Sequence, residues 1–303
     1  MMYKPRTKPQ ELRMLESLHT RMNLPQKIKQ HYIHLERGYE GELHFDSFLE
    51  KLESDVLILN DLLLKANTTT FQVDTIIISD EAIYCYEIKN YDGDYVYDAH
   101  QDKFFRSPNL EITNPLHQLA RTEALLQQLL HQHGFKVPVK SYLVFIHDAF
   151  TLYQSPLDKP IIHPTQIRNH FQQWSQIRTN IKRSQQRLAE KLLELHMEQS
   201  PFTHVPPYDY SQLKKGIICN HCRSLAIYIE GRQCICKRCA QKEPVSEAVM
   251  RSVREFQLLF PDKKVTTNRI YDWCRVVTSK KRIKRTLDKH MKKVGTNRWI
   301  YYK

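Results

Sequence analysis

The residues best suited to chemistry are two carboxylates and a lysine within residues 72–90, which read QVDTIIISDEAIYCYEIKN. Asp74 lies just inside one apolar segment, and Glu87 and Lys89 lie in the next, after a short polar turn. Side chains alternate between the two faces of a strand, so Glu87 and Lys89 share a face. In a hairpin, Asp74 comes close to Glu87. Two carboxylates and a lysine on adjacent strands could bind a divalent cation and orient or activate a water molecule.

The plain alternative is an ordinary cross-strand pair of lysine and glutamate on a solvated face. The neighbouring residues argue against it because they are large and apolar, which predicts a largely buried hairpin. These residues are Ile76, Ile77, Ile78, Ile83, Tyr84, Tyr86 and Ile88. A buried lysine and two buried carboxylates need one another, or a metal ion, to offset the loss of hydration.

The strands that must position these residues belong to a larger sheet. A first strand is expected over residues 56–64, ahead of the hairpin, and a third strand opens residues 95–107 and is followed by an exposed loop. Residues 141–148, SYLVFIHD, form a short apolar run that is typical of a buried parallel strand. With helices between them, these segments predict an α/β core with a mixed sheet.

Helices are expected on both sides of the hairpin in the sequence. Leucines at helical spacing predict a charged N-terminal arm over residues 1–37 that packs on the core. A further amphipathic helix is expected to begin near Glu42, after two glycines. Glu42 there either interacts with the helix dipole or adds an acidic group beside the metal. A cap at Asn114 or Thr113, with Pro115 at the first helical position, predicts the start of a third helix, which Gly134 ends.

Composition and charge indicate a soluble globular protein with a polyanionic partner. The 303 residues carry a net charge of +13, and no apolar run approaches the roughly 20 residues that span a bilayer. From Ser246 to Lys303 the chain has 16 lysines and arginines against 5 acidic residues, so most of the excess lies there. Nucleic acid is the favoured partner, ahead of an acidic membrane surface. The N-terminus lacks the apolar core of a secretory signal, so we expect a cytoplasmic protein without membrane association.

Two Cys-x-x-Cys pairs predict a structural zinc site. The pairs are Cys219 with Cys222 and Cys236 with Cys239, and 13 residues separate them. Each pair forms a tight turn, and two such turns supply four thiolates at tetrahedral geometry. The intervening residues alternate around a glycine, which favours a small hairpin and hence a zinc ribbon. Cys234 is the spare thiol.

The C-terminal segment has the pattern of a winged-helix or helix-turn-helix DNA binder. Three short helices are followed by one or two strands, and cations crowd the third helix. The candidate DNA contacts are Lys280, Lys281, Arg282, Lys284, Arg285, Lys289 and, in the wing, Arg298. Ile283, Leu287 and Met291 repeat every four residues and are expected to face a core. The alternative is a solvated cationic helix without a ligand.

Four short motifs resemble the nuclease-related domain, a branch of the PD-(D/E)xK nuclease superfamily. They are GYEGE at 38–42, QVD at 72–74, EIKN at 87–90 and NPLHQLAR at 114–121. The resemblance covers residues 35–150 and implies a restriction-endonuclease-like core, a mixed sheet flanked by helices. The C-terminal half lies outside it.

The resemblance also implies a role for each matching residue. Asp74 and Glu87 would hold Mg²⁺ or Mn²⁺, and Lys89 would position or help activate the attacking water. Glu42 would be the acidic residue of the helix, and Gln118 the active-site glutamine of the following helix.

The favoured hypothesis is a Mg²⁺-dependent DNA nuclease with a zinc ribbon and a basic DNA-binding module. The alternative is a non-catalytic DNA-binding or regulatory protein that retains the fold, and RNA is a further possible substrate. The expected parts are an N-terminal helical arm (1–37), a nuclease-related core (38–165), a helical extension (166–200), a linker (201–212), a zinc ribbon (213–243) and a basic winged-helix-like domain (246–303).

Overall fold

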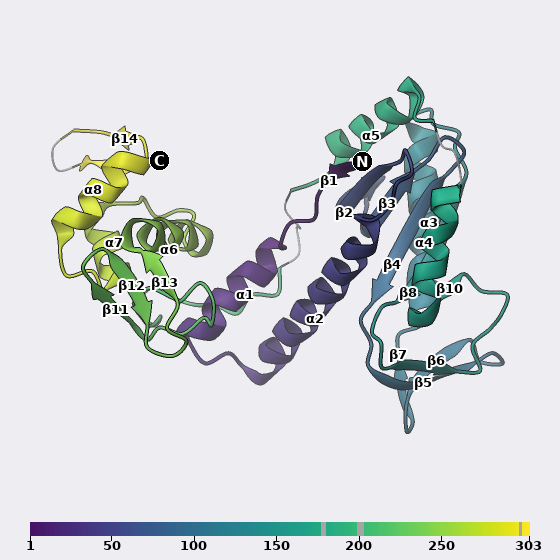
Figure 1. The fold of residues 1–303 in the computed structure, drawn as a ribbon, viewed down its shortest axis with the longest axis horizontal. Helices are drawn as coiled ribbons and strands as arrows, with labels where there is room; N and C mark the ends of the chain where they lie inside the picture. Colours follow the sequence, from purple (N-terminus) through teal and green to yellow (C-terminus); the bar gives the residue numbers. More distant parts are fainter. Residues whose placement is uncertain (177–179, 199–202, 297–298) are drawn as a thin grey trace. The chain divides into compact units, whose positions relative to one another are not determined.

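The computed structural model describes residues 1–176, 180–198, 203–296 and 299–303 (Figure 1). The chain divides into two compact units. Unit 1 combines Met1–Lys8 with Ile33–Phe202, and unit 2 combines Pro9–Tyr32 with Thr203–Lys303. Neither unit is one continuous segment. Every helix in the described part of the chain is too short or too polar to cross a membrane.

The main sheet of unit 1 has six strands in the order β1-β2-β3-β4-β8-β10. The central strands β2, β3 and β4 run antiparallel, whereas β1 lies parallel to β2, and β8 lies parallel to both β4 and β10. The predicted mixed sheet is therefore confirmed. The strands are β1 (Met2–Lys4), β2 (Leu57–Ala66), β3 (Thr69–Ile78), β4 (Ile83–Lys89), β8 (Val139–Phe145) and β10 (Ile161–Ile162).

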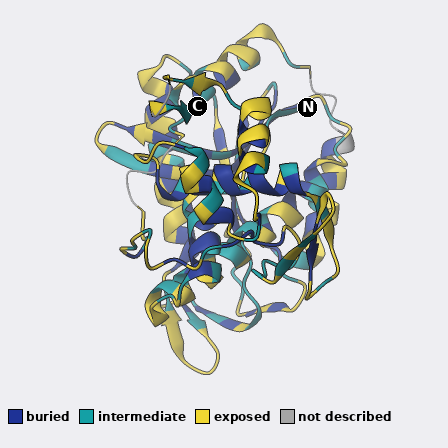
Figure 2. Ribbon diagram, turned by 90° about the vertical axis from the view of Figure 1, so that its left-hand side faces the viewer, coloured by how far each residue is buried: buried dark blue, intermediate teal, exposed yellow. Residues whose placement is uncertain are grey.

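Helices cover both faces of this sheet. On one face, Phe45 of α2 and Trp174 of α4 share a core with Tyr86. On the other face, Leu126 of α3 and Leu188 of α5 pack with the isoleucines and leucines of β2, β3 and β4. Figure 2 colours the buried residues of the chain dark blue. The helical segments are α2 (Gln26–Leu49), α3 (Pro115–Gln132), a 3₁₀ turn η1 (Pro164–Gln166), α4 (Ile167–Gln176) and α5 (Arg183–Leu195).

A second, four-stranded sheet was not foreseen. It has the order β7-β6-β5-β9 and consists of β5 (Gly93–Asp98), β6 (Lys103–Arg106), β7 (Leu110–Ile112) and β9 (Phe150–Tyr153). The expectation of one strand and an exposed loop over residues 95–107 is wrong, because that segment folds back on itself. The Asp98 carboxylate accepts hydrogen bonds from the backbone N–H groups of His100 and Gln101 and closes the turn between β5 and β6.

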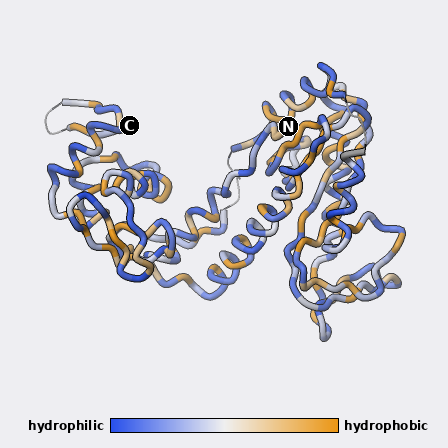
Figure 3. Tube along the Cα trace, viewed as in Figure 1, coloured by the Kyte–Doolittle hydropathy of each residue, from blue (hydrophilic) through white to orange (hydrophobic). Residues whose placement is uncertain are grey.

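The prediction that a helix begins near Glu42 is also wrong. Helix α2 runs without a break from Gln26 to Leu49 and includes both Gly38 and Gly41. Gly41 serves packing rather than chain reversal, since a Cβ atom there would lie 2.5 Å from Cβ of Asn90. Hydrophilic and hydrophobic residues alternate along α2 in Figure 3, as expected for a helix with one face on the core.

In its described residues, unit 2 contains four whole helices, the start of α2 and two small sheets. The helices are α1 (Gln10–Arg21), α6 (Val245–Leu259), α7 (Thr267–Cys274) and α8 (Lys280–His290). One sheet contains β11 (Ile227–Glu230), β12 (Gln233–Cys236) and β13 (Lys242–Pro244), and the other pairs β14 (Lys293–Val294) with β15 (Tyr301–Tyr302). Hydrogen bonds from Arg269 N–H to Thr266 and from Arg282 N–H to Ser279 cap α7 and α8.

Helix α1 belongs to unit 2, so the expectation that residues 1–37 form one arm on the core is wrong for α1, whereas Met1–Lys8 and the residues from Ile33 on belong to unit 1. Arg21, at the end of α1, is fully buried and forms an ion pair of 2.7 Å with Glu255 of α6. Its guanidinium also lies 3.9 Å from the centre of the Trp273 ring. A buried arginine needs partners of this kind, and both lie more than 200 residues away in the sequence.

Much of the predicted linker is part of unit 2 as well. The hydroxyl of Tyr208 donates to the Leu259 carbonyl at 2.7 Å, and the hydroxyl of Tyr210 donates to Asp272 at 2.6 Å. Two tyrosines give this proline-rich segment enough apolar surface to pack. Residues 201 and 202 lie outside the described part of the chain.

Candidate active site

Lys89 connects the end of β4 with the start of α3. Its Nζ donates to Oε1 of Glu87 at 2.7 Å and to Oε1 of Gln118 at 3.0 Å. Asn114 caps α3 by accepting the Leu116 N–H, which fixes the first turn that carries Gln118. The structure therefore brings together three of the five residues that the sequence selected.

Asp74 joins this group through the backbone of β4. The last residue pair of the β3–β4 ladder at this end is Thr75 with Tyr86. Beyond it, the N–H of Ile88 donates to Oδ2 of Asp74 at 2.9 Å, so a side chain takes the place of a backbone acceptor. This hydrogen bond holds the Asp74 carboxylate against β4, beside Glu87.

Glu42 approaches from α2 and is bound by an arginine that the sequence did not reveal. Nη1 of Arg6 lies 2.6 Å from Glu42, and its Nε lies 2.9 Å from Asp46. The Arg6 side chain is only 1% exposed. Asp46 follows Glu42 by one helical turn, so the sequence spacing could have identified Asp46 as a neighbour of Glu42. Nothing local marks Arg6, which lies in an irregular basic segment.

Asn90 explains why two of the motifs occur together. Its Nδ2 donates to the carbonyl of Arg37 at 2.7 Å, and its Cβ lies against Gly41. The asparagine of EIKN thus holds the end of β4 against the helix that carries GYEGE.

Burial and mutual repulsion raise the proton affinity of the acidic residues. Burial, and then the charge of Asp74, raise the pKa of Glu42 to about 8, although Arg6 opposes the shift. The same two causes raise the pKa of Glu87 to about 7 against the effect of Lys89. Burial also raises the pKa of Asp74, while Lys89 and the Ile88 N–H oppose that shift. A cation would relieve this repulsion.

The donor set suits a hard divalent cation, since Mg²⁺ prefers oxygen ligands. In the described chain, the oxygens of Glu42, Asp74 and Glu87 do not form a trio within 4.8 Å of one another. Mg²⁺ usually binds through one or two carboxylates and keeps water or phosphate oxygens as its other ligands. Asp74 and Glu87 therefore fit the ion as a pair of ligands, whereas Glu42 forms an ion pair with Arg6.

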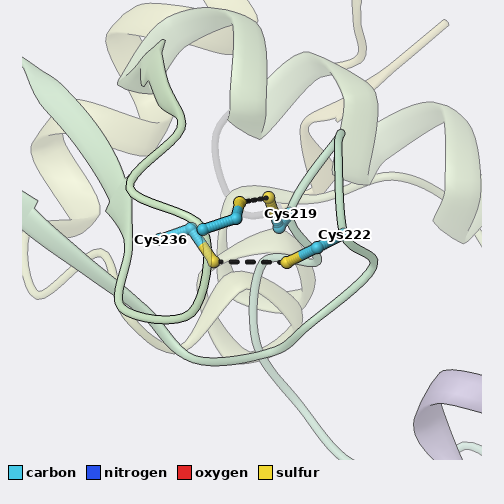
Figure 4. A group of neighbouring side chains, drawn as sticks. Cys219, Cys222 and Cys236 are labelled. Atoms are coloured by element: carbon cyan, nitrogen blue, oxygen red, sulfur yellow. Dashed lines mark hydrogen bonds between the residues drawn. The ribbon is translucent and has the colours of Figure 1, made fainter.

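The four cysteines converge as predicted and could hold zinc. Their sulfur atoms all lie within 4.8 Å of one another. Sγ of Cys219 lies 3.7 Å from that of Cys239, and Sγ of Cys222 lies 3.5 Å from that of Cys236 (Figure 4). Four thiolates about 2.3 Å from a tetrahedral zinc ion would be about 3.8 Å apart. The observed spacing is close to that value.

Both cysteine turns have the same backbone design. The N–H groups of His221 and Arg238 each donate to the first sulfur of their pair at 3.4 Å. The residue after each pair, Arg223 or Ala240, has a positive φ of 61° or 58°. β11 and β12 form the predicted hairpin. Cys234 is buried in the hydrophobic core and is not one of the four converging thiols.

The basic residues of α8 lie mostly on the surface. Lys280, Lys281, Lys284, Arg285 and Lys289 are exposed, and the predicted core residues Ile283 and Leu287 are buried. Arg282 donates to the carbonyl of Gly231 at 3.0 Å, so it also connects α8 with the β11–β12 turn. Arg298 lies outside the described residues. Trp299 is 85% exposed.

The comparison with known families agrees with the motifs. Residues 37–146 match the family model described as nuclease-related domain. No curated protein and no solved structure matches the chain. The matched range contains the acidic cluster, Lys89 and Gln118, but not the four cysteines or α8. The chain therefore contains a nuclease-related domain, which occupies residues 37–146.

Proposed function

We propose that this protein is a Mg²⁺-dependent deoxyribonuclease that hydrolyses phosphodiester bonds. The observation that carries the proposal is the contact of Lys89 with Glu87 and Gln118, beside a half-buried Asp74. This group lies inside the range that matches the nuclease-related domain.

Each residue of the group has a distinct task in such a reaction. Asp74 and Glu87 would hold the cation, which when bound supplies a Lewis acid and lowers the pKa of a coordinated water. Lys89 places a positive charge where negative charge develops in the transition state. Gln118 accepts from Lys89 and fixes the direction of the ammonium group. Burial keeps these interactions strong because water screens them less.

Unit 2 would bind the nucleic acid. The exposed lysines and arginines of α8 suit contact with phosphates, and such binding weakens steeply as salt rises. A zinc ion on the four cysteines would stabilise the β11–β13 sheet, to which Arg282 connects α8. The helices α6, α7 and α8 followed by the β14–β15 pair have the element order of a winged helix.

A cleavage assay with matched variants tests the proposal. Asp74→Asn and Lys89→Ala should each lower Mg²⁺-dependent cleavage of DNA by about 100-fold or more. Both variants should retain the salt-dependent DNA affinity measured by gel shift. Lys191→Ala is the control, because this lysine pairs with Glu194 on the surface. Cleavage that survives in both site variants would refute the assignment of the site.

A second candidate is a non-catalytic DNA-binding or regulatory protein. It is favoured by the Arg6–Glu42 ion pair, which places a fixed cation at the acidic cluster. DNA and RNA substrates incubated with Mg²⁺, Mn²⁺ or EDTA separate the candidates. Binding without cutting under every metal condition supports the second candidate. Cutting of RNA alone would change the substrate of the first candidate from DNA to RNA.

A further inference from the structure

A second group of metal-ligand side chains lies in unit 2, apart from the cysteines. Glu11 in the first turn of α1, His31 in α2 and His204 in the segment before α6 place one ligand atom each within 4.8 Å of the others. Nε2 of His31 lies 2.8 Å from Oε1 of Glu11, and Nδ1 of His204 lies 3.9 Å from the same oxygen. The three residues come from three separate parts of the sequence.

The surroundings orient these ligands. The backbone N–H of His204 donates to Oε1 of Glu11 at 2.9 Å and so holds the carboxylate in position. The rings of His31 and His204 meet edge to face, with centres 5.4 Å apart. The side chains of Glu11, His31 and His204 are 18%, 34% and 73% exposed, which leaves a path for an ion from solvent.

The chemistry of the donors selects the class of ion. Two imidazoles and one carboxylate suit Zn²⁺ and related transition metals, whereas Mg²⁺ and Ca²⁺ prefer ligands made of oxygen alone. Three protein ligands leave one tetrahedral position for water, unlike the four-thiolate group, which closes the coordination sphere.

We propose that Glu11, His31 and His204 form a second transition-metal site, with zinc the favoured ion and water as the fourth ligand. The ion would take the place of the proton shared by His31 and Glu11, and it would draw Nδ1 of His204 toward the carboxylate. It would thereby connect the segment before α6 with α1 and α2. The site does not depend on nuclease activity.

A metal-binding experiment on the full-length protein tests this site. Protein first loaded with one equivalent of Zn²⁺ is titrated with Co²⁺, which reports thiolate ligands by an intense charge-transfer band and nitrogen or oxygen ligands by weak visible bands. We expect a further equivalent of Co²⁺ to bind without new charge-transfer intensity. Thiolates are soft ligands that retain zinc, so the cobalt signal comes from nitrogen or oxygen ligands, and the ligand variants assign it to the second site.

Variants of the ligands decide the outcome. Loss of an outer-shell partner costs 10- to 100-fold in affinity, so loss of a ligand in His31→Gln or Glu11→Gln should weaken Co²⁺ binding by about 100-fold or more. His34→Gln, on an exposed position of the same helix, is the control and should bind normally. The far-ultraviolet circular dichroism of each variant checks its fold. Cobalt binding that is absent, or that persists unchanged in both ligand variants, overturns the site and leaves Glu11 as a hydrogen-bond acceptor only.

Discussion

Burial of Glu87 beside Asp74 makes the stability of the nuclease-related domain depend on pH. The pKa of Glu87 rises from 4.5 to about 7 on folding, mainly because the group is buried, so the folded state binds the proton more tightly than the unfolded state. A folded-state pKa above the unfolded value gives stability at low pH, and this stability is lost as the pH rises through the folded-state pKa.

Without added divalent cations, the free energy of unfolding should therefore fall between pH 5 and pH 8. The share of Glu87 is on the order of 3 kcal/mol, from a shift of about two and a half pH units at 1.36 kcal/mol each. Glu87→Gln should flatten this dependence in urea denaturation at the two pH values. Glu53→Gln, at an exposed position of the same unit, serves as the control. An unchanged slope in Glu87→Gln would contradict the argument.

Arg6 illustrates a residue whose role only the fold reveals. Its guanidinium reaches Glu42, Asp46 and the Thr75 hydroxyl at once. Arg6→Ala should lower the free energy of unfolding by about 3 kcal/mol, since it leaves buried acidic groups without their cation. Arg37→Ala, which removes an exposed pair with Asp92 at 3.5 Å, should change it by less than about 1 kcal/mol. Equal effects in thermal or urea denaturation would disprove the special role of Arg6.

At the scale of elements, the sequence predicted what local patterns encode. The β3–β4 hairpin, the Asn114 cap and the cysteine hairpin follow from alternation, capping and turn chemistry. The break in α2 was predicted wrongly because a glycine that a chain reversal requires and a glycine that makes room for a neighbouring side chain look the same in a sequence. The second sheet was missed because its pairing of β5 with β9 joins segments far apart in the chain.

The two glycines of α2 provide a matched test of that distinction. Glycine to alanine inside a helix normally stabilises by roughly 0.5–1 kcal/mol. Gly38→Ala should show this gain, because nothing lies within 4 Å of the added Cβ. Gly41→Ala should instead destabilise the protein, since its Cβ would lie 2.5 Å from Cβ of Asn90. Chemical denaturation of both variants measures whether each substitution raises or lowers the free energy of unfolding. Stabilisation by Gly41→Ala would show that α2 and the end of β4 are not in contact at this position.

At the scale of the whole molecule, unit 2 is assembled from two distant segments. α1 contributes Leu18 to the same core as Val249, Phe256 and Trp273. The sequence could not reveal this, since an amphipathic helix of charged residues and leucines fits either unit. The basic character of residues 246–303 and the four-cysteine cluster were visible because each is local in sequence.

A fragment of residues 203–303 should therefore fold poorly. It lacks α1, and it leaves Glu255 without Arg21 and the core without Leu18. The same fragment joined to residues 9–32 through a flexible linker should unfold cooperatively on heating in the presence of zinc. Arg21→Ala in the fused protein should lower its melting temperature. A fragment 203–303 that unfolds as cooperatively as the fused protein would show that α1 is dispensable.

The division of unit 2 also affects how the chain is made. A growing polypeptide emerges from the ribosome N-terminus first, and domains generally fold as their segments become available. Arg21 is synthesised 234 residues before Glu255, its partner in the ion pair. α1 therefore cannot bury its apolar face against α6 until the nuclease-related domain has been synthesised. A nascent chain stalled before α6 would expose that face to chaperones, whereas one stalled after α8 would have covered it.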